Sequence, residues 1–144
     1  MAWRNPGSDS PWVHMNFQLK IIEISSLLPH EEIDLDHFPK LLEEVKKNKF
    51  VVPVVADKKT LVILDGHHRF TIMKTLGFKV MPAYLVNYND TNIKVTPRRK
   101  EYVVTKKEII QRGLTGNLYP YKTTKHIINN LKKQKISFDL LAKK

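Results

Sequence analysis

A short polar sequence between an apolar run and a helix-like segment most constrains how this chain can fold. Residues 60–64 are Thr-Leu-Val-Ile-Leu, which is typical of a buried strand, and residues 65–69 are Asp-Gly-His-His-Arg. The apolar residues that follow recur with helical spacing up to Gly77, and glycine commonly ends a helix. The sequence therefore predicts a strand that ends in a tight Asp-Gly turn, which opens a helix.

This junction carries groups that suit an anionic ligand. The first N–H groups of a helix have no partner within the helix and lie at the positive end of its dipole. Phosphate and carboxylate groups bind well at such a position. Arg69 and the two histidines would add hydrogen-bond donors. The junction is therefore a candidate phosphate site.

The same residues also have simpler interpretations. Asp65 and Gly66 suit an ordinary turn, and Arg69 suits a surface salt bridge. Their joint occurrence at one junction favours a site. His67 and His68 would point about 100° apart at a helix start, so they do not readily bind one metal ion together. Asp65 is a candidate ligand for magnesium, which usually takes one or two carboxylates plus substrate phosphates.

The composition is that of a globular chain with an uneven distribution of charge. The chain has 144 residues, 42% of them hydrophobic, and a net charge of +11. From Arg98 onward lie 13 of the 25 lysines and arginines but 3 of the 14 acidic residues. A basic end of this kind suits nucleic acid, a polyphosphate or a solvated surface. The absence of cysteine excludes disulfides, thiolate zinc sites and cysteine nucleophiles.

The start of the chain lacks the marks of an exported protein. Residues 1–13 have no apolar core of a signal peptide, and no apolar run approaches the roughly 20 residues of a membrane span. We therefore expect a cytoplasmic protein without a membrane partner. Residues 1–16 are expected to form a flexible extension, and residues 17–144 a single domain.

Apolar spacing predicts short strands mixed with short helices, which favours the α+β class. The expected strands are 17–24, 50–56, 60–64, 80–88, 93–95 and 102–104. The expected helices are 35–48, 67–77, 105–113 and a last one that starts at residues 122–126. Thr105 is followed three residues later by Glu108, which is the pattern of a capping box.

Two further groups of polar residues are candidates for chemistry. Glu31 and Glu32 follow Pro-His in a predicted loop, and they are either solvated carboxylates or a general base or metal ligand. Thr123 and Thr124 stand at the start of the last expected helix, where they would cap it or bind phosphate or a small polar substrate. His126 would lie in the first turn of that helix, and its role is equally open.

Taken in order, these motifs resemble the ParB/sulfiredoxin-like superfamily, and most of all its archaeal free-L-serine kinases. The resemblance rests on Pro-His-Glu at 29–31, the Asp-Gly-His-His-Arg signature and Thr-Thr-Lys-His at 123–126. It covers about residues 18–90 and 105–140. It implies a small mixed sheet with surrounding helices. It also implies a kinase that makes O-phospho-L-serine from free L-serine and ADP or ATP with Mg²⁺, in support of cysteine biosynthesis.

The resemblance implies a role for each matching residue. Glu31 would be the general base, and Asp65 a second catalytic residue that also holds magnesium. Six residues would bind the nucleotide and its phosphates: Gly66, His67, His68, Arg69, Thr123 and Thr124. Lys125 and His126 would contact the substrate. Lys125 stands where the family is expected to have arginine. Lysine cannot make the planar bidentate contact that arginine makes with phosphate.

Other functions of the same superfamily lead to different expectations. The basic end of the chain suits a ParB-like regulator that binds DNA or a nucleotide, so nucleic acid is the alternative partner. The sulfiredoxin reaction requires a cysteine in the signature turn, and this chain has none. The sequence leaves open whether ADP or ATP is the donor. It also leaves open whether serine, homoserine or threonine is the acceptor.

Overall fold

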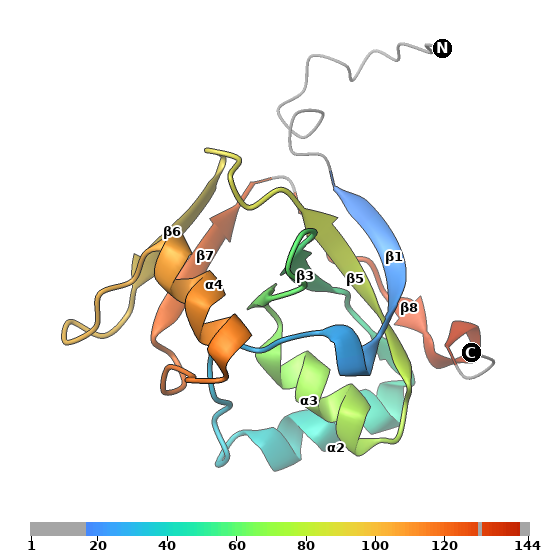
Figure 1. Ribbon diagram of the computed structural model, residues 1–144. Helices are drawn as coiled ribbons and strands as arrows, with labels where there is room; N and C mark the ends of the chain where they lie inside the picture. Colours follow the sequence, from blue (N-terminus) through green and yellow to red (C-terminus); the bar gives the residue numbers. More distant parts are fainter. Residues whose placement is uncertain (1–16, 130, 142–144) are drawn as a thin grey trace, which may run out of the picture.

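A four-stranded mixed sheet forms the centre of the fold in the computed structural model, which describes residues 17–129 and 131–141 (Figure 1). The strand order is β1-β5-β3-β4. β1 (Gln18–Glu23) runs antiparallel to β5 (Val80–Val86), and β5 runs parallel to β3 (Val54–Asp57). β3 pairs antiparallel with β4 (Ile63–Asp65). The predicted α+β class with a small mixed sheet is confirmed.

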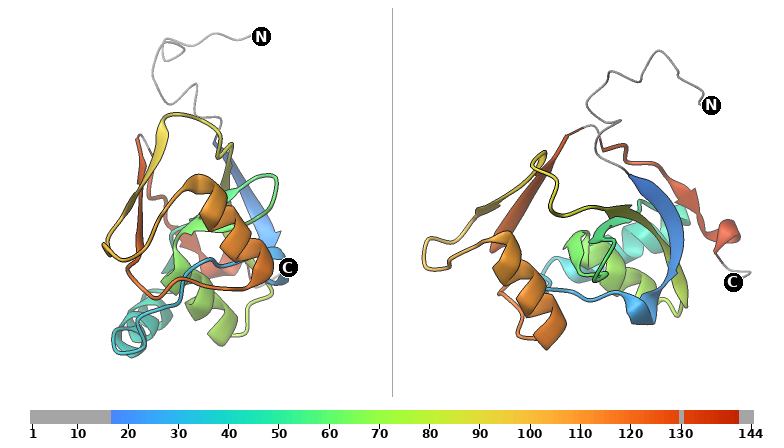
Figure 2. Two further views of the ribbon diagram at one scale, coloured as in Figure 1. Left: turned by 60° about the vertical axis from the view of Figure 1, so that its left-hand side comes forward. Right: turned by 45° about the horizontal axis from the view of Figure 1, so that its top comes forward.

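Within the described residues, two smaller sheets and three helices surround this centre. The antiparallel pairs are β2 (Phe50–Val51) with β8 (Ile136–Ser137), and β6 (Ile93–Pro97) with β7 (Thr124–Ile128). The helices are α2 (Phe38–Asn48), α3 (His67–Thr75) and α4 (Lys106–Thr115), with short 3-10 turns η2 (Ile24–Ser26) and η3 (Phe138–Leu140). Figures 1 and 2 show α2 and α3 on one side of the central sheet and α4 with β6 and β7 on the other.

The hydrophobic core lies on both faces of the central sheet because successive strand residues point to opposite faces. In β3, Val54 and Ala56 join a cluster that contains Phe70 of α3, while Val55 joins the cluster that contains Ile109 of α4. All four residues of β3 are buried. A strand covered on both faces reads as a continuous apolar run, which is why the sequence predicted it without alternation.

Two predicted elements have different bounds in the structure. The predicted strand 50–56 is divided at Val52-Pro53, so that β2 and β3 belong to different sheets. Proline has no N–H to give to a sheet, which explains the break. The helix predicted from Leu35 begins only at Phe38, with a proline in its first turn, and Leu35 is 76% exposed. The αL stop at Gly77 is confirmed by its φ of 88°.

The largest error of prediction concerns the end of the chain. The expected last helix is the strand β7, which pairs with β6, and residues 102–104 form no strand. Burial alternates along β7, so that Thr124, His126 and Ile128 are half-buried while Lys125 and Ile127 are exposed. Such alternation is typical of a strand with one covered face, whereas the apolar residues Ile127, Ile128 and Leu131 alone suggest helical spacing.

Helix α4 begins as the sequence predicted but ends later. The hydroxyl of Thr105 accepts a hydrogen bond from the N–H of Glu108 at 3.1 Å, which confirms Thr105 as the N-cap of α4. The reciprocal bond of a capping box is not formed, because the carboxylate of Glu108 accepts from Nε of Arg112 at 3.1 Å instead. The helix continues past Gly113 to Thr115 and is ended by Gly116 at φ 78°. Gly113 has another role, because a Cβ atom there would lie 2.6 Å from Cγ2 of Val62. Glycine at this position lets α4 pack directly on Val62.

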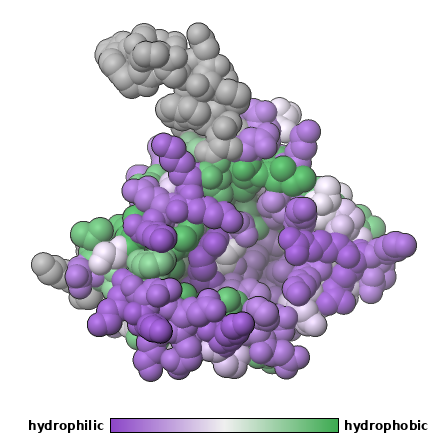
Figure 3. Space-filling model, turned by 180° about the vertical axis from the view of Figure 1, so that it is seen from behind, coloured by the Kyte–Doolittle hydropathy of each residue, from purple (hydrophilic) through white to green (hydrophobic). Residues whose placement is uncertain are grey.

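The surface is largely hydrophilic on the face seen in Figure 3, with hydrophobic side chains gathered toward its upper edge and one side. No helix in the described ranges is long and apolar enough to cross a membrane. The expected N-terminal extension, residues 1–16, lies outside the described residues.

The contact between Gly113 and Val62 leads to a test of stability. Gly113→Ala should lower the free energy of unfolding, because overpacking costs about 1–3 kcal/mol and outweighs the helix propensity of alanine. Urea unfolding measures the change. Leu114→Ala is the matched control, since Leu114 is 58% exposed. Adding Val62→Ala should relieve the strain that Gly113→Ala introduces, because it removes the methyl groups that the new Cβ atom meets. A Gly113→Ala protein more stable than the wild type would contradict the close contact between α4 and Val62.

Candidate active site

Residues 28–34, here called the strap, connect η2 to α2 and are hydrogen bonded along both edges. One edge is bound to the segment that leads into β4, and the other to the loop between α4 and β7. The backbone bonds are Leu28 N–H to Leu61 O (3.0 Å), Ile63 N–H to Leu28 O (2.8 Å), Tyr119 N–H to His30 O (2.9 Å) and Glu32 N–H to Tyr119 O (2.8 Å). The strap therefore has a fixed position, and it places Glu31 between α3 and β7.

The carboxylate of Glu31 occupies a nest of backbone N–H groups. Lys122 donates to Oε2 at 3.1 Å, while Thr123 and Thr124 donate to Oε1 at 3.3 and 2.9 Å. The hydroxyl of Thr124 also donates to Oε1, at 2.8 Å. Lys122 has φ 56°, and such a left-handed residue turns successive N–H groups toward one point. These groups therefore bind an anion, and this anion is a side chain of the protein.

Burial raises the pKa of Glu31 above its ordinary value, although the hydrogen bonds from the nest oppose this effect. A carboxylate with a raised pKa holds a proton more readily and is a better base. Oε1 accepts three of the bonds and Oε2 only one, from Lys122. Oε2 therefore keeps a lone pair that can accept a proton from a bound hydroxyl group.

The turn from β4 into α3 has the geometry that the sequence predicted. Gly66 precedes the first residue of α3 with φ 106°, and a Cβ atom there would lie 2.7 Å from Nη2 of Arg69 and from Cγ1 of Val54. Only glycine fits this position, because the guanidinium of Arg69 folds back over it. Nη2 of Arg69 lies 3.7 Å from Oδ2 of Asp65, and Nε of Arg69 is buried without a partner in the described residues. Burial lowers the pKa of Arg69, and Asp65 opposes this.

The two histidines of the signature hold the strap against α3. Nε2 of His67 accepts a hydrogen bond from the N–H of His30 at 3.2 Å, and Nε2 of His68 accepts one from the N–H of Asp34 at 3.0 Å. An accepting Nε2 carries no proton, so each neutral ring has its proton on Nδ1. Burial lowers the pKa of both rings, which keeps them neutral. For a phosphate, each histidine can therefore offer only Nδ1–H.

Three imidazole rings cluster behind Glu31. The His30 ring lies 4.5 Å from that of His67 and 5.9 Å from that of His126, measured between centroids. Nε2 of His126 is 2.8 Å from the hydroxyl of Tyr88. Burial lowers the pKa of His30 to about 4 and that of His126 to about 3. The cluster is neutral at neutral pH, so the positive charge of the site comes from lysine and arginine.

The structure brings the predicted site residues together around one pocket of about 400 Å³, here called the basic pocket. Every predicted site residue lines it except Thr123, which is fully buried and donates its hydroxyl to Pro120 O at 2.6 Å. Four further residues line it: Leu41, Leu64, Arg98 and Lys122. The predicted placement of Thr123, Thr124 and His126 at a helix start is wrong, because they belong to the loop before β7 and to β7 itself.

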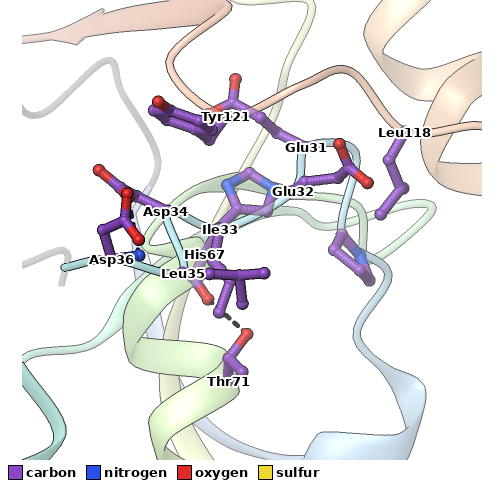
Figure 4. A pocket seen from close by; sticks show the side chains of 11 residues that line it. Glu31, Glu32, Ile33, Asp34, Leu35, Asp36, His67, Thr71, Leu118 and Tyr121 are labelled. Atoms are coloured by element: carbon purple, nitrogen blue, oxygen red, sulfur yellow. Dashed lines mark hydrogen bonds between the residues drawn. The ribbon is translucent and has the colours of Figure 1, made fainter. Parts of the chain in front are cut away.

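A second pocket of about 590 Å³, here called the acidic pocket, shares Glu31 and His67 with the first. Three more carboxylates line it: Glu32, Asp34 and Asp36. Figure 4 shows His67 near the middle of this pocket, above Thr71. The basic pocket and the acidic pocket therefore meet at the carboxylate of Glu31.

Sequence reasoning missed three residues of the site. Arg98 lines the basic pocket and donates its N–H to Thr123 O at 2.7 Å, and the Arg-Arg pair at 98–99 was a visible signal in a loop. Lys122 contributes to the nest through its backbone, which no side-chain pattern reveals. His30 belongs to the Pro-His-Glu string, which gives no sign that its side chain is fully buried beside Glu31.

Magnesium could be held here only by a small number of protein ligands. Within the part of the chain that the structure describes, no group of three or more histidine, cysteine or acidic side chains could hold a metal ion. Asp65 lines the basic pocket, and its side chain is 54% exposed. One exposed carboxylate fits the usual binding of magnesium, which relies on few carboxylates and on the phosphates of a nucleotide.

Comparisons with known proteins agree with this architecture. No family model matches the chain. A ParB-like protein of Sulfolobus acidocaldarius is 35% identical over 80 residues, which are 56% of this chain and 40% of that protein. An ATP-dependent L-serine kinase of Staphylothermus marinus is 37% identical over 81 residues, which are 52% of this chain and 32% of the relative. The chain therefore spans about a third to two fifths of the length of these relatives.

A solved structure of a free serine kinase variant in complex with AMP superposes with a TM-score of 0.77 at 15% identity. The match covers 87% of this chain and 94% of that one. This chain has the free serine kinase fold. The resemblance that the sequence showed to this group and to the ParB/sulfiredoxin-like superfamily is thereby confirmed.

In this version of the free serine kinase fold, the neutral histidines make stability depend on pH. His30, His67 and His126 bind protons near pH 6.5 when unfolded but only at lower pH when folded, so acid favours the unfolded chain. The free energy of unfolding should fall as pH drops from about 6.5 to about 4, by roughly 3 kcal/mol for His30 alone. The raised pKa of Glu31 has the opposite effect on the free energy of unfolding, because its protonation favours the folded chain. This is the effect of one group against that of three histidines.

Urea unfolding at a series of pH values measures how steeply the free energy of unfolding falls as pH drops. His126→Gln should reduce this slope, whereas His37→Gln should leave it unchanged because His37 is exposed. Equal stability of the wild type at pH 7 and pH 4.5 would contradict the assignment of neutral buried rings.

Proposed function

We propose that this chain transfers a phosphoryl group from ADP or ATP to the hydroxyl of free L-serine, giving O-phospho-L-serine. One observation carries the proposal: the half-buried carboxylate of Glu31, with a raised pKa, lies where a basic and an acidic pocket meet. The fold of a free serine kinase and a relative named L-serine kinase support it.

The basic pocket suits the phosphates of the nucleotide. Four cationic side chains line it: Arg69, Arg98, Lys122 and Lys125. The start of α3 lines the same pocket, so its first N–H groups and the Nδ1–H groups of the signature histidines are available as donors. Phosphoryl transfer depends mainly on alignment and on neutralising charge on the phosphate oxygens, which these groups supply.

The acidic pocket suits the amino group of the acceptor. Its carboxylates, Glu32, Asp34 and Asp36, would attract the α-ammonium group of an amino acid. A simple alcohol would gain nothing from them, so we infer an amino-acid acceptor. Homoserine and threonine carry the same ammonium group and remain alternative acceptors.

The chemistry follows from the position of Glu31. The serine oxygen attacks the terminal phosphorus atom of the nucleotide, the new O–P bond forms, and the terminal anhydride O–P bond breaks. The O–H proton of serine moves to Oε2 of Glu31 as the attack proceeds. Magnesium bound at Asp65 would neutralise charge on the phosphate oxygens.

The product indicates the metabolic role that we propose. O-Phospho-L-serine carries a good leaving group on its β-carbon, which a sulfur nucleophile can displace. We therefore assign the reaction to the support of cysteine biosynthesis in the cytoplasm.

A DNA-binding or nucleotide-binding regulator is the second candidate. It is favoured by the 13 basic residues against 3 acidic ones from Arg98 onward and by the ParB-like relative. Binding of a DNA duplex that weakens steeply with salt, together with no turnover of any acceptor, would support it. Turnover without duplex binding would exclude it.

The kinase proposal predicts that Glu31→Gln lowers turnover of serine by about 10²–10⁴-fold, because the amide cannot accept the proton. Mass spectrometry of O-phosphoserine, with ADP and ATP as donors and magnesium present, measures the rate. Glu44→Gln is the matched control, since Glu44 is an exposed carboxylate of α2. Wild-type turnover in Glu31→Gln would contradict the role of Glu31 as the base.

Asp65→Asn should also lower turnover strongly, because an amide binds magnesium more weakly than a carboxylate does. Raising the magnesium concentration should recover part of the rate in this variant and none of it in Glu31→Gln. Circular dichroism checks that both variants stay folded. An unchanged rate and unchanged magnesium dependence in Asp65→Asn would remove the metal role.

A further inference from the structure

We propose that Thr124 and His30 form a proton relay behind Glu31, which takes up the proton that the acceptor hydroxyl loses. The inference rests on the proposed function for the source of the proton. The relay itself rests on the hydrogen-bond geometry of three side chains that lie in contact.

The neutral ring of His30 carries its proton on Nδ1. Nδ1 of His30 lies 2.6 Å from the carbonyl oxygen of Ile63. A carbonyl oxygen only accepts hydrogen bonds, so Nδ1 must carry the proton. In the neutral ring, Nε2 then has a free lone pair, and this atom lies 3.0 Å from Oγ1 of Thr124.

The hydroxyl of Thr124 has one proton for two acceptors. Its Oγ1 lies within hydrogen-bond distance of two acceptors, Nε2 of His30 at 3.0 Å and Oε1 of Glu31 at 2.8 Å. A hydroxyl group has one proton, so it can satisfy only one of them. With Glu31 ionised and His30 neutral, the three side chains are therefore one proton short of a complete set of hydrogen bonds.

One added proton completes the set in either of two arrangements. In the first, the carboxyl group of Glu31 carries the proton on Oε1, the oxygen that faces Thr124, and donates to Oγ1, whose hydroxyl donates to Nε2 of His30. A proton received on Oε2 reaches this position when the carboxyl group turns about its Cγ–Cδ bond and its two oxygens exchange places. In the second, His30 carries it on Nε2 and donates to Oγ1, whose hydroxyl donates to Glu31. The reaction supplies this proton, because the O–H bond of the acceptor breaks as its O–P bond forms. After the product leaves, the proton returns to solvent through Glu31, since His30 is fully buried.

The surroundings of His30 favour proton sharing over a permanent charge. His67 of α3, His126 of β7 and Tyr119 are its aromatic neighbours, and the histidine rings are neutral. Glu31 is the acidic group in contact with the relay. Burial lowers the pKa of His30 to about 4 and raises that of Glu31 above its ordinary value, so His30 no longer binds a proton more tightly than Glu31 does.

Two substitutions separate a relay from a purely structural contact. Thr124→Val removes the hydroxyl but keeps the shape and the backbone N–H that binds Glu31. His30→Asn keeps an N–H near the position of Nδ1 for the carbonyl of Ile63 and has no atom at Nε2. Thr124→Ser is the conservative control that restores the hydroxyl.

The relay predicts opposite changes in the pH dependence of kcat/KM for serine. In Thr124→Val, Glu31 loses a donor, so its pKa and the acidic limb of the profile should move to higher pH. In His30→Asn, the hydroxyl of Thr124 donates to Glu31 alone, so the limb should move to lower pH. Both variants should lower kcat about tenfold or more with little change in KM for the nucleotide, and Thr124→Ser should recover most of the rate. Wild-type profiles in Thr124→Val and His30→Asn would overturn the relay and leave the kinase proposal standing.

Nitrogen NMR of the imidazole rings tests the relay without any turnover. The ¹⁵N resonances of His30 at pH 7 should show a protonated Nδ1 and a free Nε2, and the Nε2 resonance should shift in both Glu31→Gln and Thr124→Val. No response of Nε2 to either substitution would overturn the relay. A response in a protein that phosphorylates no acceptor would support proton sharing and contradict the kinase proposal.

Discussion

The Glu31 carboxylate in its nest of N–H groups is the interaction on which the site depends. It joins the strap to the start of β7, across 91 positions of sequence at Lys122. A buried carboxylate is costly unless it is hydrogen bonded, and charge-assisted bonds of this kind are strong. The same contact orients the proposed base and closes one wall of the basic pocket. Catalytic geometry and local stability therefore rest on one group.

The features that the sequence predicted well are those that local chemistry determines. The turn at Asp65-Gly66 needs a left-handed residue, and glycine takes this conformation without strain. The stop at Gly77 and the cap at Thr105 follow from the same kind of short-range reasoning. Together with the apolar spacing, they placed the signature at the start of a helix.

The features that the sequence did not reveal depend on partners far away in the chain. Residues 124–128 form a strand because β6 offers them backbone bonds, and no local pattern contains that information. Thr124 binds a carboxylate of the strap, and both signature histidines accept N–H groups from it. Direct contact of these residues with phosphate therefore stays a prediction. In the histidines, Nδ1–H is the ring group left to donate to a phosphate, because Nε2 already accepts a hydrogen bond.

The strap has a consequence for how ligands reach the reaction centre. A mobile lid needs an edge that can come free, whereas the strap is bound through Leu28 on one edge and through His30 and Glu32 on the other. The base therefore stays in place while ligands arrive. Because two different pockets lead to Glu31, donor and acceptor need not pass through one opening. Such an arrangement suits a ternary complex with direct transfer, in which neither ligand must leave before the other enters.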